Sequence, residues 1–213
     1  MKKLAVIGAG DLGQLISYHA VSDNKYEVIG YFDDTLEVGA VIKDVKVIGN
    51  LNDITTFYKS MLFDCLIVGI GYNHMKFRQS VFDKYIKNIP FATVIHSTSY
   101  VDPSCSIGAG VFILPGCVLD KDVTIGSNVL LNTGCIIAHD TQVDDHSFLS
   151  PAVKIAGKTR IGKRCVLGIN STIIDNITLA DDIKIGGGAV VINDLLIPGL
   201  YVGLPAIFKK TIV

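Results

Sequence analysis

The sequence is short of the features that mark secreted, membrane and nucleic-acid-binding proteins. Its 213 residues hold 19 Lys and Arg against 20 Asp and Glu, so no positive excess is present to bind nucleic-acid phosphates. No apolar run approaches the roughly 18 residues of a membrane helix, and the run after Met1 is too short for a signal peptide. The five cysteines include no Cys-x-x-Cys pair, which argues against a disulfide framework or a thiolate metal site. There is no Trp, but 49% of the residues are hydrophobic, so we expect a cytoplasmic protein with a sizeable core.

Residues 1–96 alternate between strand-like and helix-like segments. Apolar and β-branched runs predict strands, and the longer mixed segments between them predict helices. The expected strands are 3–7, 26–32, 45–48, 64–71 and 91–95, and the expected helices are 12–21, 51–59 and 73–87. This alternation favours a small parallel sheet with helices on its faces. We therefore expect an α/β, Rossmann-like domain over residues 1–96, with Asn73 as the N-cap of its last helix.

A glycine motif of the type Gly-x-Gly-x-x-Gly, at residues 8–13, lies between the first expected strand and helix. Such glycines let the backbone approach a phosphate at the N-terminus of the helix. Asp33 follows Gly13 by 20 residues, at the end of the second expected strand, where a carboxylate can accept hydrogen bonds from a ribose. Because the segment holds only half of a dinucleotide fold, it favours a mononucleotide over NAD. The alternative is a tight turn that binds nothing.

Residues 101–195 repeat with a period of six. Every sixth residue from Val101 to Val191 is Val, Ile or Leu, and small or β-branched residues dominate the fourth position after each. This pattern is typical of a hexapeptide β-helix, in which three hexads, or 18 residues, close one triangular coil. We expect such an all-β domain over residues 97–213. Four cysteines occupy the small inward position and are predicted to be core residues: Cys105, Cys117, Cys135 and Cys165.

His139 and Asp140 fall outside the inward positions of their hexad, which are Ile137 and Thr141. A carboxylate beside an imidazole holds it in one tautomer and makes it more basic, as a general base requires. The alternative is an ordinary surface histidine. His146 also falls outside the inward positions and is a weaker candidate. Gly157 lies 18 residues after His139, so we expect it one coil away, where a glycine leaves room for an extended cofactor arm. Later glycines, including Gly187, are expected to continue that groove.

These features together resemble a known family. A mononucleotide-type α/β domain followed by a hexapeptide β-helix is similar to the bacterial sugar acetyltransferases of the sialic acid O-acetyltransferase (NeuD) group. Within that group, the chain looks most like the PglD-type N-acetyltransferases of nucleotide-linked 4-amino sugars, and the resemblance covers nearly the whole chain. It is carried by residues 8–13, 32–34, 70–73, 131–134, 139–140, 156–157, 167–171, 179–182, 186–189 and 202–206.

The resemblance implies a left-handed β-helix, a homotrimer with its site between neighbouring prisms, and acetyl-CoA as donor with no metal. By position, His139 is the implied general base and Asp140 the acid that raises its basicity. The residues implied to bind the sugar nucleotide are Gly10, Asp11, Leu12, Asp33, Asp34 and Gly71. Those implied to bind acetyl-CoA are Gly157, Ile169 and Gly187. Phe148 stands where the family often has a second histidine.

The implied reaction is acetylation of the 4-amino group of a UDP-linked amino-dideoxy sugar by direct attack on the thioester, for surface glycan or glycoprotein biosynthesis. O-acetylation of a sugar of the sialic acid type, with the same base, is the first alternative. A zinc hydratase on the same prism is more remote, because it needs three converging histidines. A non-catalytic NAD-sensing or assembly protein would need the missing half of the dinucleotide fold.

Overall fold

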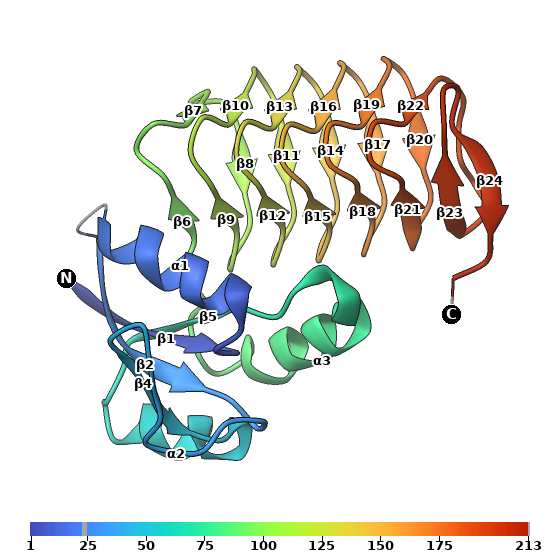
Figure 1. The fold of residues 1–213 in the computed structure, drawn as a ribbon. Helices are drawn as coiled ribbons and strands as arrows, with labels where there is room; N and C mark the ends of the chain where they lie inside the picture. The colour runs from blue at the N-terminus through green and yellow to red at the C-terminus, as the bar shows by residue number, and fades with distance from the viewer. Residues whose placement is uncertain (23–24, 213) are drawn as a thin grey trace. The chain divides into compact units, whose positions relative to one another are not determined.

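The computed structural model describes residues 1–22 and 25–212. The chain divides into two compact units, Met1–Val94 and a second unit that begins at Ile95 (Figure 1). Among the described residues, no helix is both long and apolar enough to span a membrane.

The first unit is an α/β domain around a five-stranded sheet with the order β3-β4-β2-β1-β5. Its elements are β1 (Lys2–Ile7), α1 (Asp11–Ser22), β2 (Tyr26–Phe32), β3 (Val41–Ile42), β4 (Val45–Gly49), η1 (Leu51–Asp53), α2 (Ile54–Lys59), β5 (Cys65–Val68), η2 (Tyr72–His74) and α3 (Met75–Tyr85). The central strand β1 pairs in parallel with β2 on one side and with β5 on the other, and its residues Leu4–Ile7 are fully buried. This arrangement confirms the Rossmann-like domain, in which parallel strands point their carboxyl ends to one edge.

The expected all-parallel sheet is wrong at one edge. Strand β3 pairs antiparallel with β4 through a two-residue turn, in which Lys43 and Asp44 have φ of 45° and 68°. Two central residues with positive φ match the twist of a hairpin, so the chain folds back here without a crossover helix.

The ends of two other expected elements also differ. Helix α3 begins at Met75, and Asn73 lies inside the preceding 3-10 turn and therefore does not cap it. The strand expected over 91–95 is reduced to a bridge between Phe91 and Leu66 and to β6 (Val94–Ile95).

The second unit is a β-helix with three faces (Figure 1). Face 1 contains β7 (Tyr100–Val101), β10 (Val118–Leu119), β13 (Ile136–Ile137), β16 (Lys154–Ile155), β19 (Thr172–Ile173) and β22 (Val190–Val191). Face 2 contains β8 (Ser106–Ile107), β11 (Thr124–Ile125), β14 (Gln142–Val143), β17 (Arg160–Ile161) and β20 (Thr178–Leu179). Face 3 contains β6, β9 (Phe112–Ile113), β12 (Leu130–Leu131), β15 (Phe148–Leu149), β18 (Val166–Leu167), β21 (Ile183–Ile185), β23 (Gly199–Val202) and β24 (Ile207–Lys210).

Strands one coil apart pair in parallel and in register, so that Ile137 stands beside Leu119 on one side and Ile155 on the other. The step between these partners is the 18-residue coil that the hexads predict. A slip by one residue would turn every aliphatic side chain outward, and the hexads therefore determine the register.

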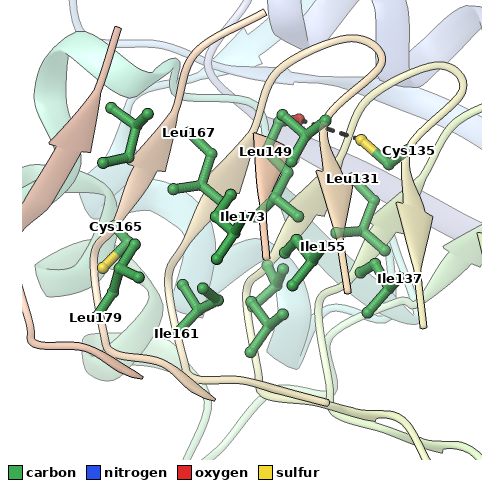
Figure 2. Packing of buried hydrophobic residues seen from close by; sticks show 14 of the residues in the cluster. Leu131, Cys135, Ile137, Leu149, Ile155, Ile161, Cys165, Leu167, Ile173 and Leu179 are labelled. Atoms are coloured by element: carbon green, nitrogen blue, oxygen red, sulfur yellow. Dashed lines mark hydrogen bonds between the residues drawn. The ribbon is translucent and has the colours of Figure 1, made fainter. Parts of the chain in front are cut away.

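The inside of the β-helix is filled by the periodic aliphatic residues. From Ile113 to Val191, every sixth residue is at most 3% exposed. Figure 2 shows these side chains stacked in rows, one residue from each coil.

The inward cysteines belong to this core. Cys117, Cys135 and Cys165 are fully buried, and Cys105 is partly buried. The Cys135 thiol donates to the carbonyl oxygens of Leu149 (4.0 Å, Figure 2) and Ser150 (3.3 Å). Burial raises the pKa of Cys165 to about 12, so its thiol is not ionised near neutral pH and is a poor nucleophile.

Three corners join the faces, and each turn from Ala109–Gly110 to Gly187–Gly188 has its second residue in the left-handed region. The corner between faces 1 and 2, here the His139 corner, stacks Lys121–Asp122, His139–Asp140, Gly157–Lys158 and Asp175–Asn176. The corner between faces 3 and 1, here the Ile169 corner, stacks Pro115–Gly116, Thr133–Gly134, Pro151–Ala152, Ile169–Asn170 and Gly187–Gly188. The third corner, between faces 2 and 3, carries His146. Face 1 therefore lies between the His139 and Ile169 corners.

Candidate functional sites

A cavity of about 490 Å³ lies at the carboxyl ends of the parallel strands in the first unit. It is lined by Ile7, Gly8, Gly10, Asp33, Asp34, Thr35, Leu51, Gly69, Ile70, Gly71, His74 and Phe77. Most of these residues follow β1, β2 or β5, and the direction of strand order reverses between β1 and β5. Ligands of open α/β sheets bind at such a reversal, outside the carboxyl ends of the strands.

The glycine motif contributes Gly8 and Gly10 to the lining of this cavity. Gly8 has φ of +96°, a conformation that disfavours any side chain, and Gly13 packs so closely that a Cβ would overlap the carbonyl oxygen of Gly8. At Gly10, by contrast, a Cβ would meet nothing within 4 Å. The first and last glycines thus allow strand β1 and helix α1 to approach each other, while Gly10 faces open space at the helix N-terminus.

Asp33 holds the glycine turn in place. Its Oδ2 accepts a hydrogen bond from the Ala9 N–H at 2.8 Å, and its Oδ1 accepts from the Thr35 N–H at 2.8 Å and the Thr35 hydroxyl at 2.6 Å. Partial burial would raise the pKa of Asp33, but these hydrogen bonds outweigh it and hold the pKa below its usual value. Both carboxylate oxygens are therefore already bonded within the chain, so Asp33 shapes the cavity as well as lining it.

Asp34 is placed differently. Its Oδ1 accepts from the Leu51 N–H at 2.8 Å, and its side chain is exposed at the cavity. Asp34 therefore ties the start of η1 to the end of β2 while remaining open to a ligand.

Four of the predicted nucleotide residues line this cavity together: Gly10, Asp33, Asp34 and Gly71. Asp11 and Leu12 begin helix α1 and do not line it. The sequence prediction missed Leu51, His74 and Phe77, since nothing in their spacing links them to the glycine motif.

Arg78 was also missed, and it supports the loop that follows β5. It is 1% exposed, and its Nη1 donates to the carbonyl oxygens of Val68 (2.9 Å) and Ile70 (3.0 Å). Burial lowers the pKa of its guanidinium, because the charged form is harder to desolvate. Arg78 thus fixes the path of the chain into Gly71.

The second constellation lies on the His139 corner. With its proton on Nδ1, the His139 imidazole donates to Asp140 Oδ2 at 2.8 Å, and the two side chains are 52% and 49% exposed. The hydrogen bond from His139 lowers the pKa of the Asp140 carboxyl, which keeps it ionised. Asp140 has φ of 59°, a conformation that Asp tolerates better than most residues. The pair therefore leaves Nε2 of an oriented imidazole for proton transfer.

Gly157 lies directly against the His139 ring, one coil away. A Cβ on Gly157 would lie 2.8 Å from both Cε1 and Nε2 of that ring. Ile169 and Gly187, the other implied cofactor residues, are stacked together on the Ile169 corner, across face 1. Within one chain, Gly157 and Gly187 therefore do not line one continuous groove, and that prediction is wrong. The 30 residues from Gly157 to Gly187 are not a whole number of 18-residue coils, so the two glycines lie on different corners.

His146 differs from its expected outer position. It is outside the inward positions, but it is only 4% exposed, and its Nδ1 accepts from Asn128 Nδ2 at 3.1 Å. Phe148 is likewise buried, on face 3. Within residues 1–22 and 25–212, no three His, Cys, Asp or Glu side chains converge as a metal site would need, so no zinc hydratase site is found there.

Comparison with known proteins matches both units to described domains. The PglD N-terminal domain family matches residues 3–85, and the GMPPB C-terminal domain family matches residues 91–193. The acetyltransferase domain of PglB from Neisseria gonorrhoeae is 25% identical, with a TM-score of 0.87 over 98% of this chain and 100% of that one. These matches support a bacterial sugar acetyltransferase of the PglD type. The chain is an acyltransferase with a left-handed β-helix, as the sequence resemblance implied.

Other relatives of this PglD-type acetyltransferase have been solved with ligands. A histidine-to-alanine variant of GDP-perosamine N-acetyltransferase from Caulobacter crescentus, in complex with CoA and GDP-perosamine, is 26% identical. Its TM-score is 0.92 over 99% of this chain and 98% of that one. The PglB domain has also been solved with acetyl coenzyme A. WeeI from Acinetobacter baumannii, at 19% identity and a TM-score of 0.83 over 98% of this chain and 100% of that one, shares the fold.

Proposed function

We propose that this acetyltransferase transfers the acetyl group of acetyl-CoA to the 4-amino group of a UDP-linked amino-dideoxy sugar, in surface glycan or glycoprotein biosynthesis. The observation that carries the proposal is the His139–Asp140 pair, which presents an oriented imidazole on an exposed corner. The relative solved with both CoA and GDP-perosamine supports a sugar nucleotide as acceptor and acetyl-CoA as donor. UDP as the nucleotide and a cytoplasmic location stay predictions from the sequence.

His139 acts as the general base. The amine nitrogen of the sugar attacks the thioester carbonyl carbon, a C–N bond forms, and His139 Nε2 takes the proton that the nitrogen loses. The tetrahedral intermediate then collapses, the C–S bond breaks, and the proton passes to the departing CoA thiolate. Backbone N–H groups suit the stabilisation of the oxyanion, and no covalent enzyme intermediate is needed.

The acceptor nucleotide binds in the cavity of the first unit. Its phosphates lie at the glycine turn, because the N–H groups and dipole at the start of α1 favour negative charge. The exposed carboxylate of Asp34 faces N–H or hydroxyl donors of the base or ribose. Asp33 and Gly71 complete the walls, and a role for Asp11 and Leu12 stays a prediction from the sequence.

The active enzyme is a homotrimer. Face 1 exposes Tyr100, Val118 and Ile136 on its outer side, whereas the outward strand residues of face 2 are all polar, including Thr124 and Gln142. An exposed apolar face of this kind marks a surface for protein association.

Threefold packing of this face also assembles the donor site. If three copies turn face 1 toward a common axis, the His139 corner of each copy meets the Ile169 corner of the next. Acetyl-CoA then lies between Gly157 of one copy and Ile169 and Gly187 of its neighbour. This arrangement brings together residues that are separated across face 1 within one chain.

The test is release of CoA thiol over a panel of UDP-, dTDP- and GDP-linked 4-amino sugars, the same sugars free, and matched 4-hydroxy sugars. We expect the UDP-linked amino sugar to have the highest kcat/KM, and UDP to compete with the acceptor but not with acetyl-CoA. Equal rates with free sugars would exclude the nucleotide role of the first unit. Faster reaction of the hydroxy sugars would make the enzyme an O-acetyltransferase instead.

A further inference from the structure

Gly157 occupies a position whose backbone does not need glycine. Its φ lies outside the left-handed region. The backbone around it makes the hydrogen bonds that link successive coils: Lys158 N–H donates to the His139 carbonyl oxygen, and Asn176 N–H donates to the Gly157 carbonyl oxygen, each at 3.0 Å. The backbone at 157 would therefore accept an alanine. The space beside the Cα, however, would not accept its methyl group.

That space is filled by the His139 ring. The three nearest heavy atoms to a Cβ built on Gly157 are Cε1 at 2.8 Å, Nε2 at 2.8 Å and Cδ2 at 3.3 Å, all of that imidazole. Real Cβ contacts are not this short, so a methyl group at 157 and the ring cannot keep these positions together. Gly168 differs, because a Cβ there would meet backbone, with Gly187 N at 2.6 Å.

The ring has two restraints in this structure. The first is the hydrogen bond from Nδ1 to Asp140 Oδ2 at 2.8 Å. The second is the bare Cα of Gly157 on the opposite edge, where Cε1 and Nε2 lie. The imidazole is 52% exposed in the single chain, so a ring pushed off Gly157 has room to leave its hydrogen bond with Asp140.

We infer that Gly157 is a positioning residue for His139: its missing side chain seats the imidazole so that Nδ1 reaches Asp140 and Nε2 is held at one point. The inference rests on the proposed function for its catalytic consequence, but its structural content does not. It differs from a role in lining the acetyl-CoA groove, because the atoms that Gly157 accommodates belong to the enzyme.

The test is Gly157→Ala, measured in three ways. We expect kcat to fall about tenfold or more, with the KM for acetyl-CoA changed less than about threefold, because misplaced groups lower turnover steeply. In the free enzyme, 15N NMR of the imidazole should show loss of the fixed Nδ1–H tautomer. 13C NMR should show the pKa of the Asp140 carboxyl moving upward toward its usual value, since the hydrogen bond from His139 is the largest of the causes that lower it.

Two controls separate the ring from the coil. In a His139→Ala background there is no ring to displace, so adding Gly157→Ala should leave thermal stability unchanged. Asp175→Ala changes the equivalent position of the same corner one coil beyond Gly157, away from the ring, and should leave the NMR signals and kcat as in the unaltered enzyme.

An unchanged tautomer and Asp140 pKa in Gly157→Ala would overturn the inference. So would a rise in the KM for acetyl-CoA with kcat unchanged, which is the signature of a residue that only lines the cofactor groove. The NMR measurements need no substrate. If no sugar in the panel is acetylated, the proposed function is refuted. The NMR spectra still decide whether Gly157 positions His139.

Discussion

Replacing His139 by alanine separates catalysis from folding in this enzyme. The imidazole is 52% exposed and lies on a corner, outside the aliphatic core, so its removal takes away little buried surface. Loss of a general base lowers turnover by about 10²- to 10⁴-fold. At about 1.36 kcal/mol for each tenfold change, this corresponds to roughly 2.7–5.5 kcal/mol of transition-state stabilisation.

The assay is release of CoA thiol at saturating acetyl-CoA and acceptor, with circular dichroism and sedimentation as checks on fold and assembly. We expect kcat to fall at least about 100-fold while the KM for acetyl-CoA changes little, because the base acts on the amine proton in the transition state. A variant that keeps kcat within about threefold of the unaltered enzyme would refute the assignment of His139 as base.

Asp140→Asn provides the graded comparison. The amide still accepts a hydrogen bond from Nδ1 but removes the negative charge, and exposed ion pairs contribute little in water. We therefore expect a loss in kcat of about fivefold or less. A loss as large as that of His139→Ala would mean that Asp140 has a direct part in the chemistry.

Three further predictions concern the rest of the molecule. Folding lowers the pKa of Asp33, so its ionised carboxylate stabilises the folded enzyme. This stabilisation is fully present above the usual carboxyl pKa near 4, and it is lost as the pH falls through the lower pKa of the folded state. The difference in unfolding free energy between the unaltered enzyme and Asp33→Asn should therefore narrow between about pH 5 and pH 2 in urea titrations, and a constant difference would contradict this. Arg78→Met leaves two carbonyl oxygens unpaired, and urea unfolding should show a loss of about 1–3 kcal/mol for each, with a raised acceptor KM. Ile136→Lys, on the exposed side of face 1, should shift the sedimenting species from three times 22.9 kDa toward the single chain, and an unchanged mass would place the interface elsewhere.

The β-helix was predictable because its period is a simple geometric constraint. Each hexad has two inward positions, so the sequence assigns a face to every residue from Val101 to Val191, and an 18-residue coil follows. The same arithmetic separates the His139 corner from Gly187, since 30 residues is not a multiple of 18. That separation was therefore present in the spacing, although the groove predicted from the glycines overlooked it.

The first unit was predictable in outline and less so at its edges. Alternating apolar runs indicate parallel strands and helices, and the glycine motif marks the turn after β1. The hairpin of β3 and β4 depends on positive φ at Lys43 and Asp44. Neither residue is glycine, which is the usual sequence signal for such a turn, so the hairpin was not predicted.

By itself, then, the sequence determined the two domain types, the register of every coil and the pairing of His139 with Asp140, because periodicity and adjacency are properties of the chain. Only the tertiary structure decided how side chains meet across long separations. It showed that both carboxylate oxygens of Asp33 accept hydrogen bonds from within the chain and that Arg78 donates to the loop after β5. It also showed that the His139 ring packs against Gly157. Such contacts depend on side-chain rotamers and close packing between segments, and no linear pattern specifies these.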